Sequence, residues 1–169
     1  MEASAPGVTI RHPNREKAES KATKAIVVLL LLASAGLVAI ITFGGWSALQ
    51  GAQFVAIAAI LIYLLMAYYV ARWNRGVLPV ASALAILIAV LAAIAAPAWF
   101  DRDKPGLHNP ALPPSLLGTL CIVLVPVSLF LIAFAMRGFT QNWHVEVEEG
   151  GPGDADDERS SGGARPQAA

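Results

Sequence analysis

Three side chains of types that could carry out chemistry, Asp101, Asp103 and His108, lie close together in this sequence. Carboxylates and imidazoles are the groups that enzymes most often use to transfer protons. Arg102 and Lys104 lie among them, in a segment that continues through several prolines to residue 114. Because nothing in the sequence fixes the geometry of these side chains, we interpret the segment as a surface for external recognition and predict no catalytic residue.

Metal and disulfide chemistry are not expected either. His12, His108 and His144 lie in three separate segments, and Cys121 is the one cysteine. A single cysteine forms no intramolecular disulfide and no cysteine-built metal site. We therefore predict no metal, no cofactor and no enzymatic activity. The 12 basic and 12 acidic residues balance, which gives no indication of a nucleic-acid partner.

Three long runs without a charged residue dominate the chain: 25–71, 76–100 and 105–136. A membrane-spanning helix needs roughly 20 apolar residues, so the first run is long enough for two. Gly44-Gly45 and Gln50-Gly51 interrupt that run and mark a turn. The sequence therefore predicts an all-α membrane protein, a bundle of four transmembrane helices. The predicted spans are about 25–43, 52–71, 78–99 and 115–136.

The basic residues predict the orientation of the spans, because short cytoplasmic loops are enriched in Lys and Arg. Ten of them fall on one side, in segment 1–24, in the link after the second span, and after the fourth span, whereas the opposite side has Arg102 and Lys104. We predict that both termini are cytoplasmic. Tryptophans favour the membrane–water interface, and one lies near an end of each span, which predicts four interface anchors: Trp46, Trp73, Trp99 and Trp143.

The first span has an alternative interpretation as a signal peptide. Lys21 and Lys24, the apolar residues 25–32 and the triplet Ala33-Ser34-Ala35 imitate one with its cleavage site. The apolar run continues through Phe43, however, so we expect a retained span.

The flanking segments are polar. Segment 1–24 is basic and is interpreted mainly as a topology signal; attraction to anionic headgroups is the alternative, which Glu16 and Glu19 weaken by diluting the charge. Segment 138–149 alternates apolar and polar residues from Trp143 to Glu148, which suggests a short extended piece at the interface. Segment 150–169 is acidic and rich in Gly, and we expect it to be disordered.

Small residues predict where the helices pack. In membranes, small side chains let helix backbones approach closely. The third span has a ladder of alanines at four-residue spacing, which could meet small residues of the first span. The predicted packing residues are Ala81, Ala85, Ala89 and Ala93 of the third span, with Ala35, Gly36 and Ala39 of the first.

The spans contain no Asp, Glu, Lys, Arg or His, although ionisable residues mark most transport and proton pathways in membranes. We therefore predict a non-enzymatic accessory or assembly component that binds another membrane protein, or a second copy of itself, within the lipid bilayer. The alternative is a small oligomeric transporter or channel. Its pore would be lined by Thr42, Ser82, Thr119, Ser128 and the backbone freed by Pro126. A membrane enzyme acting through Asp101, Asp103 and His108 ranks third.

Three short motifs carry a resemblance. Trp73-Asn74-Arg75-Gly76, the corner from Pro97 to Gly106 and Met136-Arg137-Gly138-Phe139 resemble small four-span membrane proteins of high-GC actinobacteria, over about residues 25–149. The resemblance implies a location in a bacterial inner membrane, and it implies no activity or site.

Overall fold

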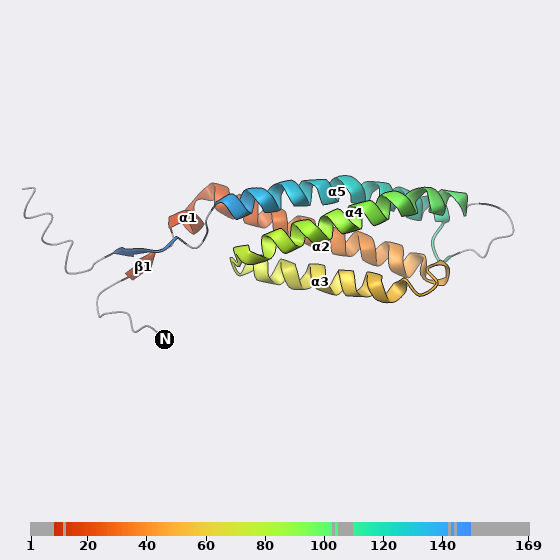
Figure 1. Ribbon diagram of the computed structural model, residues 1–169, viewed down its shortest axis with the longest axis horizontal. Helices are drawn as coiled ribbons and strands as arrows, with labels where there is room; N and C mark the ends of the chain where they lie inside the picture. Colours follow the sequence, from red (N-terminus) through yellow and green to blue (C-terminus); the bar gives the residue numbers. More distant parts are fainter. Residues whose placement is uncertain are drawn as a thin grey trace, which may run out of the picture.

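The computed structural model describes residues 9–11, 13–102, 104, 110–141, 143 and 145–149. Four long helices form its body (Figure 1): α2 (Ala18–Gly44), α3 (Gln53–Ala71), α4 (Leu78–Asp101) and α5 (Pro114–Thr140). All four are long and apolar enough to cross a membrane. The predicted all-α bundle of four transmembrane helices is therefore confirmed. The predicted segment 150–169 lies outside the described residues.

The turn between α2 and α3 forms where glycines interrupt the first apolar run. The amide of Gly45 donates to the carbonyl of Ile41 and caps α2, and a short 3₁₀ helix, η1 (Trp46–Ala48), follows. Gln50 and Gly51 then adopt positive φ angles of 42° and 97°, a region that glycine enters at little cost. The Gln53 amide group donates to the carbonyl of Trp46 at 3.0 Å, which closes the turn.

The corner between α3 and α4 is tighter. It contains η2 (Arg75–Val77), a second 3₁₀ helix. Trp73 has a φ of 65°, and the side chain of Asn74 accepts a hydrogen bond from the amide of Gly76 at 3.1 Å. Pro79 falls in the first turn of α4, where the missing amide hydrogen costs nothing. These local contacts reverse the chain within a few residues.

The four helices do not pack with equal closeness. α4 lies along α5, and α2 packs against both α3 and α5, whereas α3 and α4 make little contact although they are consecutive in the chain. Figure 1 shows α4 crossing from the end of α3 toward α5. We call the end of the bundle with the α3–α4 corner the tail end, because α2 begins and α5 ends there. The opposite end is the loop end.

Much of the bundle surface is apolar. Only about a third or less of the most apolar window of each long helix is buried, between 28% and 33%. Large side chains such as Phe54, Leu29 and Ile94 are exposed by 78%, 65% and 67%. An apolar surface of this extent around the whole bundle is what lipid tails contact in a membrane protein.

The segment after α5 contains a strand that pairs with a strand near the N-terminus. Strand β2 (Val147–Glu149) pairs in antiparallel register with β1 (Thr9–Arg11), and Ile10 lies opposite Glu148. The sequence predicted an extended piece here but not its partner. This pairing places the two ends of the described chain side by side, beyond the short helix α1 (Pro13–Glu16).

The packing face of α4 differs from the predicted ladder. Ala81 and Ala85 are fully buried, Ala89 is half-buried and Ala93 is exposed. A four-residue step overshoots one helical turn by about 40°, so a strict ladder rotates away from a straight partner. The buried face passes instead to Ile88, Ala92, Ala96 and Trp99.

The main partner of that face is α5. α4 packs on α5 and makes little contact with α2. In α2, Ala35 is buried and Ala39 is half-buried. Gly36 is exposed, and a Cβ added to it would have no atom within 4 Å. Gly36 therefore makes no close packing contact, and the predicted contact of Ala35 and Ala39 with the alanines of α4 stays a prediction.

Two glycines of the α2 region give matched tests of packing. A Cβ at Gly45 would lie 2.5 Å from Cη2 of Trp99 and 2.9 Å from the carbonyl oxygen of Ile41. We expect Gly45→Ala to lower the free energy of unfolding in detergent micelles by about 1–3 kcal/mol through overpacking. Gly36→Ala should be neutral or stabilising by up to about 1 kcal/mol, since alanine favours the helix. Equal effects would contradict this packing.

Candidate functional site

An apolar groove lies between α3 and α4 in the half of the bundle near the loop end. Its volume is about 400 Å³, and side chains of all four long helices line it. The groove exists because α4 leans on α5 and leaves α3, which stays with α2. We call it the lateral groove.

Both walls of the lateral groove combine alanines with larger aliphatic side chains. Ala52, Ala56 and Ala59 line the α3 side, at the spacing of one helix face. Ala92 and Ala95 belong to the α4 side. Alanines on facing walls are typical of surfaces where helix backbones approach closely, yet these two walls do not close on each other.

The floor of the groove offers no free polar group. It consists of residues from α2 and α5, among them Val38, Thr42, Cys121 and Leu124. The hydroxyl of Thr42 donates to the carbonyl of Val38 at 2.7 Å and is thereby satisfied within its own helix. Such a groove favours an apolar occupant, since its lining residues include no Asp, Glu, Lys, Arg or His.

A second organised cluster, at the tail end, is built around Trp143. This side chain is fully buried, and its ring meets Trp73 edge to face, with centroids 5.3 Å apart and planes at 86°. Gly138 leaves room for it, because a Cβ there would be 3.2 Å from the indole. The ammonium of Lys24 sits over the Trp73 ring, 4.1 Å from the centroid, which adds a cation–π attraction.

Polar contacts hold the segment after α5 in this position. Arg15 donates to the carbonyl oxygen of Trp143 at 2.9 Å. The indole N–H of Trp143 donates to Gln141 at 3.1 Å, and the amide of Gln141 donates to the hydroxyl of Thr23 at 3.1 Å. Arg15 lies just before α2 and Thr23 lies in α2. These hydrogen bonds therefore join the start of the first long helix to the segment that follows the last one. We call this group the tryptophan cluster.

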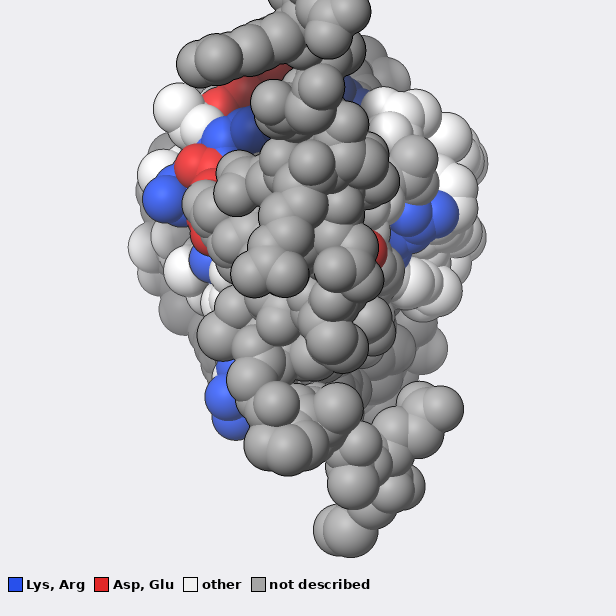
Figure 2. Space-filling model, turned by 90° about the vertical axis from the view of Figure 1, so that its left-hand side faces the viewer, with Lys and Arg blue, Asp and Glu red and all other residues white. Residues whose placement is uncertain are grey.

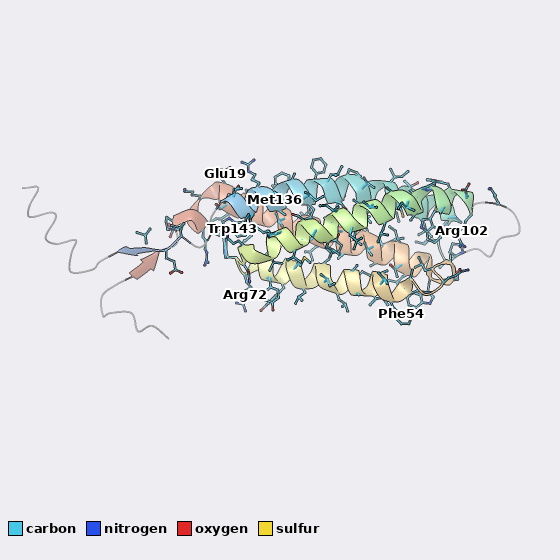
Figure 3. All side chains as sticks on the ribbon, viewed as in Figure 1. Glu19, Phe54, Arg72, Arg102, Met136 and Trp143 are labelled. Atoms are coloured by element: carbon cyan, nitrogen blue, oxygen red, sulfur yellow. The ribbon has the colours of Figure 1, made fainter. Side chains whose placement is uncertain are left out.

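An ion pair between α2 and α5 flanks the tryptophan cluster. Arg137 of α5 donates to Glu19 of α2. Figure 3 shows Glu19 and Trp143 at the same end of the molecule, with Arg72 at the end of α3. Both members of the pair are more than half exposed, so its contribution to stability is small.

The four predicted interface tryptophans differ in exposure. Trp46 is 46% exposed and stacks on Phe43 at 5.9 Å. Trp73 is half-buried, whereas Trp99 and Trp143 are buried within the protein. All four lie at or just beyond a helix end. Trp99 and Trp143, however, pack inside the protein and do not present their rings to the headgroup region.

The predicted recognition segment is only partly described. Asp101 and Lys104 form an exposed ion pair at 3.7 Å, and the Arg102 guanidinium lies 6.0 Å from the centroid of Trp99. Asp103 and His108 lie outside the described residues. Within the described part of the chain, no three His, Cys, Asp or Glu residues gather as a group that could hold a metal ion.

The hydroxyls that would line a pore belong to three different helices, and they differ in exposure. Ser82 and Thr119 donate to carbonyl oxygens of their own helices, at 3.2 Å and 2.8 Å, as Thr42 does. Ser128 is fully buried and has no hydrogen-bond partner among the described residues, a property that it shares with Ser34 and Tyr63. α5 continues through Pro126, which is exposed.

Sequence reasoning missed the lateral groove and the tryptophan cluster. Alanines at one-face spacing in the second span were a usable signal for the groove wall. For the cluster, the signal was a tryptophan in an otherwise polar segment, because a large aromatic side chain gains more from burial than its polar neighbours do.

The fold thus defines the chain as a membrane protein of four helices. Comparison with protein-family models, with curated proteins and with solved structures finds no match to this chain.

The burial of Trp143 predicts a large effect on stability. Trp143→Ala removes a fully buried ring, and such a deletion typically costs about 3–5 kcal/mol. Trp46→Ala, at the loop end and 46% exposed, should cost less than about 1 kcal/mol. The free energy of unfolding in mixed detergent micelles measures both. If Trp46→Ala lowered the free energy of unfolding as much as Trp143→Ala or more, Trp143 would not be the buried centre of the tryptophan cluster.

Proposed function

We propose that this chain is a non-enzymatic accessory or assembly component of a bacterial plasma membrane, with both termini in the cytoplasm. It binds a transmembrane helix of a partner protein in the lateral groove. The observation that carries the proposal is the groove itself, which has alanines on its α3 and α4 walls and lies between two helices that make little contact.

The orientation is supported by the charges at the two ends. Basic residues of the tail end include Arg15, Lys21, Lys24 and Arg75, whereas the described loop end has Arg102 and Lys104 beside Asp101. An excess of Lys and Arg favours the cytoplasmic side. The bacterial location rests on the resemblance to four-span proteins of actinobacteria.

A helix fits the groove better than a lipid tail does. Lipid tails adapt to any apolar relief, so they impose no requirement for small residues. Helix pairs in membranes do impose it, since close van der Waals contact is their main source of affinity. Ala56 and Ala59 on one wall and Ala92 and Ala95 on the other would let a partner helix approach both α3 and α4 closely.

The alternative of an oligomeric channel draws less support from the geometry. Thr42 and Ser82 satisfy their hydroxyls within their own helices, and Thr119 is exposed on α5 while Ser128 is buried inside the bundle. These four hydroxyls would have to face one path for a polar pore to form.

Filling the groove tests the proposal. Ala56→Phe and Ala95→Phe place a large ring in the lateral groove, from α3 and α4. Ala58→Phe and Ala83→Phe make the same change at exposed positions of the same helices, outside the groove. We expect native mass spectrometry of gently extracted protein to show a stoichiometric partner with the unaltered chain and both controls. In the groove variants we expect the affinity for the partner to fall at least about tenfold, which corresponds to about 1.4 kcal/mol of binding free energy.

Three results would count against the proposal. The first is a partner that both groove variants retain, and the second is a homo-oligomer with bound small molecules, which favours the channel. The third is a chain that carries lipid alone. The thermal stability of all four variants shows whether any loss of partner comes from unfolding.

A further inference from the structure

At the tail end, α2 projects beyond α3. The ammonium of Lys24 donates to the carbonyl oxygen of Ala71, the last residue of α3, at 3.4 Å. α2 begins six residues earlier, at Ala18. At about 1.5 Å per residue the projection is roughly 9 Å long. The headgroup layer on each side of a bilayer is roughly 5–7 Å thick, so this part of α2 crosses it.

Three lysines lie on the side of α2 that faces the end of α3. Lys17 is the N-cap residue of α2, and Lys21 and Lys24 follow at four- and three-residue steps, which keeps them on one helix face. The contact of Lys24 with Ala71 fixes that face toward α3. We call these residues the lysine stripe.

The neighbouring acidic side chain does not neutralise the stripe. Glu19 lies two residues from Lys17 and from Lys21, hence on the opposite side of the helix, and its partner is Arg137 of α5. Glu16 precedes the stripe and belongs to α1. Within the described chain, neither Lys17 nor Lys21 has a carboxylate within ion-pair distance, and both are exposed. Glu19 therefore does not dilute the charge along this face.

The surface below the stripe is aromatic. Lys24 lies over the ring of Trp73, and Tyr68, which accepts hydrogen bonds from Arg72, is exposed on α3 one turn before the corner. Indole and phenol rings favour the level of the lipid headgroups. Figure 2, which faces the tail end, shows basic side chains at several places around its rim.

We propose that the lysine stripe binds the phosphate of an anionic phospholipid headgroup, seated over the end of α3 between Lys21 and Lys24, with its acyl chains along α3. Charge complementarity carries the choice of occupant, because the ammonium groups of Lys17 and Lys21, which have no ion-pair partner in the described chain, lie at headgroup depth near a layer of phosphates. Each basic residue near an anionic surface increases the binding affinity about fivefold. The inference holds for either orientation and does not rest on the lateral groove.

The test measures lipid binding to the full chain. Phosphatidylglycerol is titrated into protein held in phosphatidylcholine nanodiscs or neutral detergent, and retained lipid is counted by native mass spectrometry. Lys17→Gln with Lys21→Gln should weaken phosphatidylglycerol binding about 30-fold, leave phosphatidylcholine binding unchanged and flatten the salt dependence. Lys24 is kept, because it packs on Trp73. The matched control, Arg102→Gln with Lys104→Gln, removes two cations at the loop end and should change binding less than about twofold.

Several results would overturn the inference. Equal losses in the lysine double variant and the loop-end control would show a nonspecific charge effect. Displacement of the lipid by millimolar inorganic phosphate would show a soluble-anion site. Binding that appears only after removal of residues 150–169 would assign the lysines to the acidic segment of this chain. An unchanged unfolding midpoint in the double variant excludes misfolding as the cause of a loss.

Discussion

The arrangement of this protein depends on the way helices adhere in hydrocarbon. Lipid tails are as apolar as leucine, so two helices gain little from contact unless their backbones approach closely. α4 has such an approach on α5, where Ala81 and Ala85 are fully buried and Phe100 fills the space left by Gly118. Because α4 follows α5, it leaves α3. The lateral groove is the consequence of this one preference.

The two ends of the bundle are secured by different means. At the tail end, where water and headgroups are available, polar and aromatic contacts predominate: Arg15, Gln141 and Lys24 hold Trp143 and Trp73 in place. At the loop end, close steric contacts are prominent among the described residues, since Trp99 lies against Gly45 and the side chain of Leu112 lies against Gly44. The lateral groove lies in the half of the bundle near the loop end, between α3 and α4.

The sequence predicted the four helices because the absence of charge over about 20 residues needs no partner to be recognised. It did not predict their faces. In helices that are apolar all round, the lipid-facing side and the buried side have the same composition, so the alanine ladder that ends at Ala93 did not indicate which of its members are buried. The groove depends on how little α3 and α4 contact each other, and the burial of Trp143 depends on the segment after α5 folding back onto the bundle. Both are features of tertiary structure. Lys21 and Glu19 are close in sequence, and only the helix geometry separates their charges.

Disulfide cross-linking within the membrane tests the separation of α4 from α3 most directly. Starting from a Cys121→Ala chain, cysteine pairs would join residues 88–98 of α4 either to residues 52–59 of α3 or to residues 117–124 of α5. A disulfide forms only where Cα atoms lie within about 7 Å. We expect rapid oxidation for α4–α5 pairs and none for α3–α4 pairs in this half of the bundle. Rapid α3–α4 cross-links at these positions would show a closed seam and contradict the account.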